Sequence, residues 1–248
     1  MKYLRSFYLS LLIICFTACK QGQSTAVLEI YVLDPLGNRV TKADINIYRT
    51  KEDWDQEKNP AKTAEITTAT GLIRFVNLEA GTYYIDVKKD SLNNWEGKVA
   101  TKVQSIGAFY VNTEFVVVKD SKSSVVASSV GKKWQAITVK QFNTTTPVEM
   151  LASAFRCRLD NILIFYKSGR YDMEGRGIKC SVSETPIEQT GTWSFNDTGT
   201  RITIKGDGRD AITWTVIVSN KDRLVFQEVL PNPFFGLTNS DVTYILTE

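Results

Sequence analysis

The chain has 248 residues, of which 43% are hydrophobic and 23% charged, and its formal net charge is +3. This length accommodates one or two domains of ordinary size. Basic and acidic residues are interspersed along the chain and form no basic stripe, which argues against a nucleic-acid partner. The chain has no histidine, so it offers neither a histidine-based catalytic triad nor a histidine-ligated zinc site.

The first eighteen residues have the pattern of a bacterial export signal. Lys2 and Arg5 provide the positive start, Phe7 to Phe16 form an apolar run that is short for a membrane span, and Ala18 is a small residue at the predicted cleavage point. We expect this segment to be removed from the mature protein. An ordinary secretory signal and a single-pass helix are the alternatives.

The end of this segment, Phe16-Thr-Ala-Cys19, resembles the lipobox of bacterial lipoproteins. In that family the cysteine is acylated through its sulfur and becomes the first residue of the mature chain. The resemblance implies that residues 1–18 are a lipoprotein signal peptide, that Cys19 is the lipidation site, and that residues 19–25 tether the protein to the outer membrane of the bacterial cell envelope. Two or three acyl chains anchor a protein firmly. The leaflet, periplasmic or surface, stays open.

The export signal changes how the four cysteines are interpreted. Cys15 is removed with the signal and Cys19 is acylated, which leaves Cys157 and Cys180. Exported proteins readily form disulfides, so we predict that these two cysteines pair and contribute ~3 kcal/mol by restricting the unfolded chain. The alternative is a metal site built on the two cysteines, and it has no histidine to complete it.

Residues 26–118 are predicted to form a first domain, a β-sandwich. Its expected strands are runs in which apolar and polar residues alternate, with turn-forming residues between them. These runs are Ala26 to Leu33, Ala43 to Arg49, Leu72 to Val76 and Tyr83 to Val87. Short alternating strands separated by turn signals are typical of two antiparallel sheets packed face to face.

The run of residues 70–84 resembles the G-x-x-x-F-x-x-L-x-x-G-x-Y pattern of transthyretin-like sandwiches, the kind of domain that accompanies carboxypeptidases as a regulatory-like module. The resemblance implies that Phe75, Leu78 and Tyr83 pack in the core and that Gly81 makes a turn. Domains of this family serve adhesive, spacer and regulatory roles. The likeness therefore predicts a fold and no particular activity.

The segment after the second predicted strand carries oxygen-bearing side chains at alternate positions, Asp53, Asp55, Glu57 and Asn59. Such spacing is found in calcium-binding loops. The central glycine and the terminal bidentate glutamate of those loops are missing. We therefore predict a solvated, charged connection in place of a calcium site.

Two tryptophans of this domain, Trp54 and Trp95, lie among polar and charged neighbours in the sequence. Aromatic side chains in loops can be contact anchors for a partner or lids over the ends of the sandwich. Large aromatic residues are usually mostly buried, which favours lids.

Residues 119–130 begin with polar and small side chains and are predicted to be a linker, and residues 131–248 are predicted to form a second domain. We expect a short helix from Thr146 to about Phe155, because Thr146 can cap it and a proline and a glutamate follow at favourable positions. The remaining pattern predicts eight strands: Trp134 to Lys140, Asn161 to Tyr166, Arg170 to Glu174, Gln189 to Phe195, Thr200 to Lys205, Ala211 to Val218, Arg223 to Glu228 and Asp241 to Thr247. Eight strands joined in a meander can close into a barrel.

This second half resembles the lipocalin-like domain of exported Gram-negative lipoproteins. The likeness rests on four stretches: Gly131 to Trp134, Cys157 to Tyr171, Cys180, and Thr190 to Phe195. It implies an eight-stranded lipocalin-like meander barrel with the capacity to hold a small hydrophobic molecule. It also implies a pair of cysteines that bracket two strands.

Three tryptophans, Trp134, Trp193 and Trp214, lie in predicted barrel strands and are the candidate ligand-facing residues. They could point inward and fill the barrel, or line its rim and stack on a ligand. Aromatic residues at strand spacing are ordinarily interior, so core packing is favoured.

The sequence thus predicts an all-β protein in which a transthyretin-like β-sandwich precedes the barrel. It contains no nucleophile elbow, phosphate loop or metal motif, so we expect no enzyme and no cofactor, although a catalytic carboxylate pair stays open. The predicted function is a membrane-anchored binding module with a small hydrophobic ligand in the barrel. The alternative is an accessory lipoprotein that docks an envelope protein or a glycan and has a packed, empty barrel.

Overall fold

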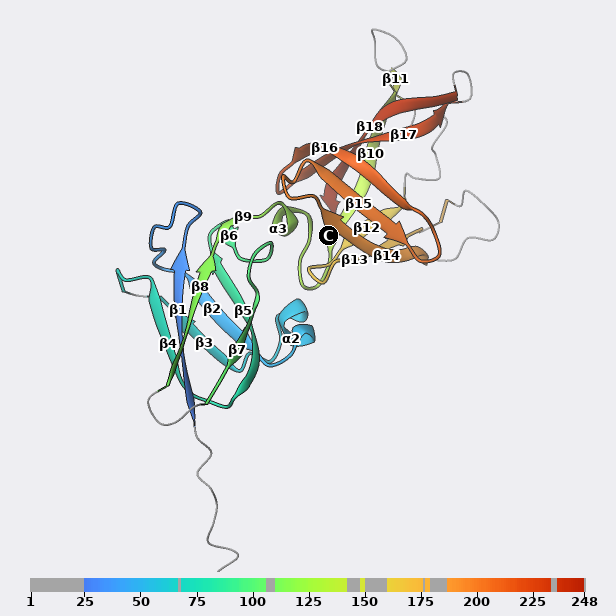
Figure 1. Ribbon diagram of the computed structural model, residues 1–248. Coiled ribbons are helices and arrows are strands. Elements are labelled where there is room, and N and C mark those ends of the chain that lie inside the picture. Colours follow the sequence, from blue (N-terminus) through green and yellow to red (C-terminus); the bar gives the residue numbers. More distant parts are fainter. Residues whose placement is uncertain are drawn as a thin grey trace, which may run out of the picture.

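The computed structural model describes residues 25–66, 68–105, 110–141, 148–149, 160–175, 177–178, 187–232 and 236–247. They form two β-structures, one after the other along the chain (Figure 1). The predicted signal and tether lie outside the described residues, and so do Cys19, Cys157 and Cys180. Within the ranges given above, no helix is long and apolar enough to cross a membrane.

The first structure is a sandwich of two sheets. One has the strand order β4-β1-β8, and the other the order β3-β2-β5-β6-β9 with β7 paired to β5. The strands are β1 (Ala26–Leu33), β2 (Asp44–Tyr48), β3 (Lys62–Glu65), β4 (Leu72–Leu78), β5 (Gly81–Lys89), β6 (Leu92–Asn93), β7 (Ala100–Val103), β8 (Val111–Val117) and β9 (Lys119–Asp120). Alternate residues of the strands supply a core of fully buried aliphatic side chains, among them Leu28, Ile30, Ile45, Ile47 and Ile85.

The strands predicted for the sandwich are present as β1, β2, β4 and β5. Phe75, Leu78 and Tyr83 are buried, which confirms the core positions that the transthyretin resemblance implied. The sequence does not predict the other five strands, β3, β6, β7, β8 and β9. The strands β3 and β7 have four residues each and pair only with β2 and β5, respectively. Their conformation therefore depends on a neighbouring strand more than on their own pattern.

The connection after the second strand is charged and mostly exposed, as predicted, but the helix α2 (Lys51–Gln56), which the sequence did not predict, occupies its first part. The side chain of Thr50 caps this helix by accepting a hydrogen bond from the backbone N–H of Asp53. Trp54 turns into the protein and is only 4% exposed. Capping and the burial of one large aromatic side chain together outweigh the charged composition of the segment.

The second structure is a closed antiparallel barrel. Its sheet has the order β11-β10-β12-β13-β14-β15-β16-β17-β18, and β18 also pairs with β10, which closes a ring of eight strands. The strands are β10 (Lys132–Gln141), β11 (Val148–Glu149), β12 (Ile162–Phe165), β13 (Arg170–Glu174), β14 (Ile187–Phe195), β15 (Arg201–Gly206), β16 (Ala211–Ser219), β17 (Arg223–Asn232) and β18 (Gly236–Thr247). Strands that are neighbours in the chain pair in order from β12 to β18. The predicted all-β class with an eight-stranded meander barrel is confirmed.

The helix predicted from Thr146 is wrong where the structure describes it. Val148–Glu149 form β11, which pairs antiparallel with Lys140 and Gln141 of β10. The rest of that predicted helix lies outside the described residues. The Thr-x-x-Glu pattern favours a helix locally, but pairing with the end of a neighbouring strand decides the conformation of these two residues.

The segment that joins sandwich and barrel is folded. The strand β9 pairs with β6 and is followed by the helix α3 (Lys122–Val126), which the side chain of Ser121 caps. Val126 is fully buried in the barrel core. Figure 1 shows α3 at the end of the barrel that is nearer the sandwich. Residues 119–130, predicted as a linker, thus include a strand of the sandwich and a helix that contributes to the barrel core.

A buried lysine of the barrel inserts into the sandwich. Lys167 lies in the turn between β12 and β13, and its side chain is 0% exposed. Its Nζ lies 3.1 Å from Oδ1 of Asp86 and 3.2 Å from Oε1 of Glu57. The same atom lies 4.0 Å from the ring centroid of Trp54 and 4.7 Å from that of Trp95. Two carboxylates and two aromatic faces replace the water that the ammonium group loses.

Burial and charge shift the pKa values at this contact in opposite directions. Burial is the largest influence on Lys167 and lowers its pKa, against the effect of the neighbouring carboxylates. Burial by itself would raise the pKa of Glu57, but a hydrogen bond from Lys88 and the charge of Lys167 hold that pKa below its usual range. Trp54 and Trp95 were expected to act as lids over the sandwich. In the structure, both rings cover the side chain of Lys167, a barrel residue.

Replacing this lysine should uncouple the two halves of the molecule. Lys167→Met leaves Asp86 buried without its closest cation, and breaking a buried ion pair in this way costs about 3 to 5 kcal/mol. We expect a lower denaturant midpoint, or separate unfolding of sandwich and barrel, by circular dichroism and tryptophan fluorescence. The control is Lys221→Met, because the Lys221 side chain is 87% exposed. Equal midpoints for both variants would show that the contact contributes no stability.

A glycine before β10 is required by its backbone and its surroundings. Gly131 has φ +89°, and a Cβ there would lie 2.6 Å from Cγ2 of Ile164. Gly131→Ala is therefore expected to destabilise the barrel by about 1–3 kcal/mol from overpacking, in addition to backbone strain. Gly208→Ala is the control, since φ is +71° there but nothing lies within 4 Å. Denaturant unfolding should show the larger loss for Gly131→Ala, and equal losses would contradict the steric argument.

Candidate functional site

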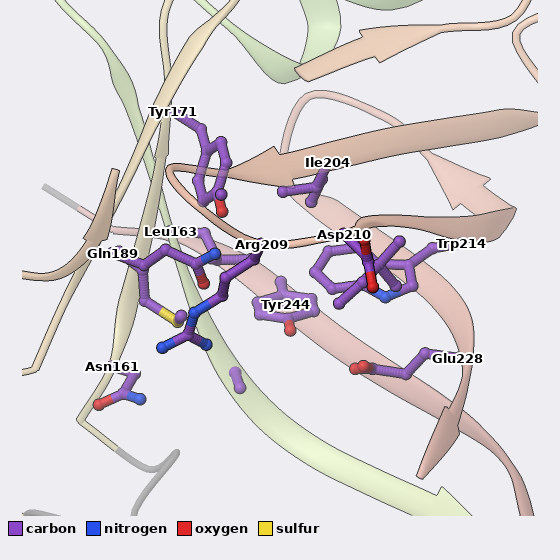
Figure 2. Close-up of a pocket in the computed structure, with 14 residues that line it drawn as sticks. Asn161, Leu163, Tyr171, Gln189, Ile204, Arg209, Asp210, Trp214, Glu228 and Tyr244 are labelled. Carbon is purple, nitrogen blue, oxygen red and sulfur yellow. The ribbon is translucent and has the colours of Figure 1, made fainter. Parts of the chain in front are cut away.

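A cavity of about 280 Å³ lies in the barrel (Figure 2), and the order of the turns places it at the end opposite α3. Successive turns of a meander lie at alternate ends of the strands. The β14–β15 turn lies at the α3 end, where a Cβ on Gly199 would touch Lys122. The next turn, between β15 and β16, lies at the other end and borders the cavity through Gly206, Arg209 and Asp210.

The cavity exists because inward-facing side chains become smaller along the barrel. On β10, Trp134 faces inward near α3, and the next inward residue, Ala136, lines the cavity. Trp134, Phe165 and Trp193 are buried and fill the end near α3. Trp193 packs edge-on against Phe165 with 5.3 Å between ring centroids. The methyl group of Ala136 cannot fill the opposite end in the same way.

The structure separates the three candidate tryptophans. The indole N–H of Trp134 donates to the carbonyl of Val126 at 2.8 Å, and that of Trp193 donates to the carbonyl of Tyr166 at 3.0 Å. Both rings belong to the packed end of the barrel and lie outside the cavity lining, whereas Trp214 is part of that lining. The structure therefore places one of the three at the candidate site.

Trp214 contributes an apolar wall to the cavity. Its ring lies 5.4 Å from that of Phe226, between centroids, and the residue is 9% exposed. Its indole N–H is buried and has no hydrogen-bond partner within the part of the chain that the structure describes. Burying an unpaired donor costs about 1–3 kcal/mol, which the packing of the ring must offset.

Tyr171 presents a polar group to the cavity. It is 2% exposed, and Figure 2 shows its hydroxyl directed into the space between the lining side chains. The hydroxyl makes no hydrogen bond with any residue in the described ranges. Burial raises the pKa of Tyr171 to about 12. The positive charge of Arg209 lowers this pKa, and the negative charge of Asp207 raises it. The phenol therefore keeps its proton near neutral pH and can donate it in a hydrogen bond.

The β15–β16 turn brings charge to the mouth of the cavity. The side chains of Arg209 and Asp210 are exposed there, and neither forms a hydrogen bond or ion pair with another described residue. Asp207 anchors the turn, because its carboxylate accepts a hydrogen bond from the Thr190 hydroxyl at 2.5 Å and its N–H donates to the Thr190 carbonyl at 2.9 Å. Ile212, 56% exposed, adds an apolar lip.

The polar groups are unevenly distributed around the cavity. In Figure 2, Arg209 and Gln189 lie on one side, below Tyr171. Asp210 and Glu228 lie on the other side with Trp214, and Glu228 is 7% exposed. The cavity thus has a side rich in hydrogen-bond donors and a side rich in carboxylates.

Sequence reasoning does not identify Tyr171, Arg209 or Asp210 as site residues. In the sequence, residues 206–210 are only the gap between two predicted strands, Thr200 to Lys205 and Ala211 to Val218. One available signal was the change from Trp134 to Ala136 at successive inward positions. If the strands form a barrel, that change predicts that large side chains fill one end of its interior and that small ones leave space at the other.

The structure gives no support for a metal site in the parts of the chain that it describes. No group of three or more histidine, cysteine, aspartate or glutamate residues is close enough there to hold a metal ion. In the segment with the calcium-like spacing, Asp55 pairs with Lys51 and Glu57 with Lys88. These carboxylates serve as partners for lysines.

Comparison with known proteins leaves the family open. No family model matches the chain, and no curated protein matches it. The structure of a streptococcal ancillary pilin aligns with 92% of this chain and 60% of its own, at 10% identity and a TM-score of 0.31. BcpA, the major pilin subunit of Bacillus cereus, aligns with 90% of this chain and 59% of its own, at 10% identity and a TM-score of 0.30. The chain spans less than two thirds of either pilin, and TM-scores this low assign neither fold nor function.

Proposed function

We propose that this protein is an exported binding protein that holds a small molecule in its barrel. The observation that carries the proposal is the cavity, which has apolar walls and a few polar side chains at its edge. The side chains of Tyr171, Arg209 and Asp210 have no hydrogen-bond partner among the described residues. Ligand sites in proteins combine an apolar concavity with a small number of such polar groups.

The cavity volume limits the size of the ligand. At about 280 Å³, it is larger than the ~150 Å³ cavity that accommodates benzene and lies just below the ~300–1,000 Å³ range of ligand pockets. The ligand is therefore a small molecule of about one or two rings, or a short chain of similar bulk. The same cavity argues against the alternative function, since a docking module with a packed barrel needs no such space.

We further propose that the protein acts from the cell envelope, anchored in the outer membrane through lipid on Cys19. The supporting observation is the signal-like sequence that ends at this cysteine. The first strand of the sandwich begins at Ala26, so a short tether would hold the sandwich near the membrane surface. In that compartment Cys157 and Cys180 would form a disulfide. The protein would act by binding alone, without catalysis or a cofactor.

Filling the cavity should abolish binding. Ala136→Phe places an aromatic ring where the wild-type side chain leaves space. Native mass spectrometry of the full protein, extracted gently from its own membranes, should show a small discrete adduct on the wild type and none on this variant. Ala100→Phe is the matched control, since Ala100 is exposed on a sandwich strand, and it should keep the adduct. A wild type that never carries an adduct, or an adduct that survives Ala136→Phe, would refute binding in the barrel.

The lipid anchor is tested at one atom. Cys19→Ser removes the sulfur to which the acyl group would be attached, and the hydrophobic anchor goes with it. We expect the variant to leave the membrane fraction after cell fractionation, while the wild type remains there until detergent is added. Cys15→Ser lies within the predicted signal and should behave as the wild type does. Membrane retention of Cys19→Ser would exclude lipidation at this residue.

A further inference from the structure

The hydroxyl of Tyr171 is a polar group in the cavity that has no hydrogen-bond partner among the described residues. The residue is 2% exposed, its hydroxyl points into the cavity in Figure 2, and no described residue forms a hydrogen bond with it. Because its pKa is about 12, it is a donor near neutral pH. A hydrogen bond from this donor is stronger when the acceptor carries a negative charge.

Two more donors lie on the same side of the cavity. Figure 2 shows the Arg209 guanidinium and the Gln189 amide below Tyr171. Neither side chain forms a hydrogen bond or ion pair with another residue of the described chain. The charge of Arg209 acts on the pKa of Tyr171, so the two groups are electrostatic neighbours. The planar guanidinium donates through a fork that matches the two oxygens of a carboxylate.

The other side of the cavity limits the charge of the ligand. Asp210 and Glu228 both line that side. A second anionic group of a ligand would lie near these carboxylates and would be repelled by them. A ligand with a single anionic group can keep that group beside Arg209 and turn an uncharged body toward Trp214. A dianion has no equivalent arrangement.

We propose that the barrel ligand is a small monocarboxylate whose carboxylate is held by Tyr171 and Arg209. Its apolar body lies against the aliphatic and aromatic wall formed by Leu163, Ile204 and Trp214. The inference rests on the proposed binding function and names the class of ligand for the same cavity. It replaces a purely hydrophobic ligand with an amphipathic one.

The test uses the full chain and two probes of nearly equal shape, cyclohexanecarboxylate and cyclohexanecarboxamide. Both have one ring, which suits a cavity of about 280 Å³, and only the first is charged. Isothermal titration calorimetry at pH 7 should show at least about tenfold tighter binding of the carboxylate, because charge-assisted hydrogen bonds are about twice as strong as neutral ones.

Two variants connect this preference to the named residues. Arg209→Gln and Tyr171→Phe should each weaken carboxylate binding about tenfold, and Arg209→Gln should weaken amide binding less than it weakens carboxylate binding. Arg201→Gln is the matched control, since Arg201 is an exposed residue at the start of the same hairpin. It should bind both probes as the wild type does.

The outcomes separate this inference from the function on which it rests. Equal affinity for the two probes, or a carboxylate affinity that neither Arg209→Gln nor Tyr171→Phe reduces, would overturn the carboxylate inference while the binding function stands. Failure of both probes to bind would also overturn it. The native mass spectrometry experiment then decides whether the cavity holds another ligand. It does so if the wild type carries a small adduct that Ala136→Phe loses.

Discussion

The buried contact at Lys167 determines how the two halves of the molecule meet. Its ammonium group is enclosed by Asp86, Glu57 and two tryptophan rings of the sandwich, although it belongs to a barrel turn. Trp193 holds that turn from the barrel side, since its indole N–H donates to the carbonyl of Tyr166 and its backbone N–H to the carbonyl of Gly169. The same tryptophan belongs to the packed end of the barrel. The ion contact and the aromatic packing thus stabilise one continuous region, and the space for a ligand lies at the other end.

Packing divides the barrel into two unequal parts. Near α3, large buried side chains such as Trp134 and Phe165 face inward and pack together. Toward the β15–β16 turn, Ala136 and Gly206 occupy inward or lining positions and contribute little volume. An eight-stranded barrel is just wide enough for side chains to fill it or for one small ligand. The residue sizes at successive inward positions therefore decide which end is core and which end is a site.

Buried polar groups in this protein have two different roles. Where partners are present, as for Lys167 and for the indole N–H groups of Trp134 and Trp193, the group strengthens the fold. Where the described residues provide no partner, as for the hydroxyl of Tyr171, the group is available to a molecule that enters the cavity. The free energy lost by leaving such a group unpaired is returned when a ligand supplies the acceptor. This contrast distinguishes the candidate site from the surrounding core.

The sequence by itself determined the all-β class and most of the strands, because alternation of apolar and polar residues follows directly from the two faces of a strand. It also determined the core positions of Phe75 and Tyr83. It did not determine the short elements α2 and β11, whose local pattern is ambiguous. A cap and the burial of Trp54 stabilise α2, and pairing with β10 decides the conformation of β11. The site could be predicted only in part: Trp214 was a candidate, whereas Tyr171 and Arg209 come together only after the barrel closes. Closure is a long-range property, in which β18 pairs with β10 across a hundred residues of chain, and only the tertiary structure decides which inward side chains face each other across the cavity.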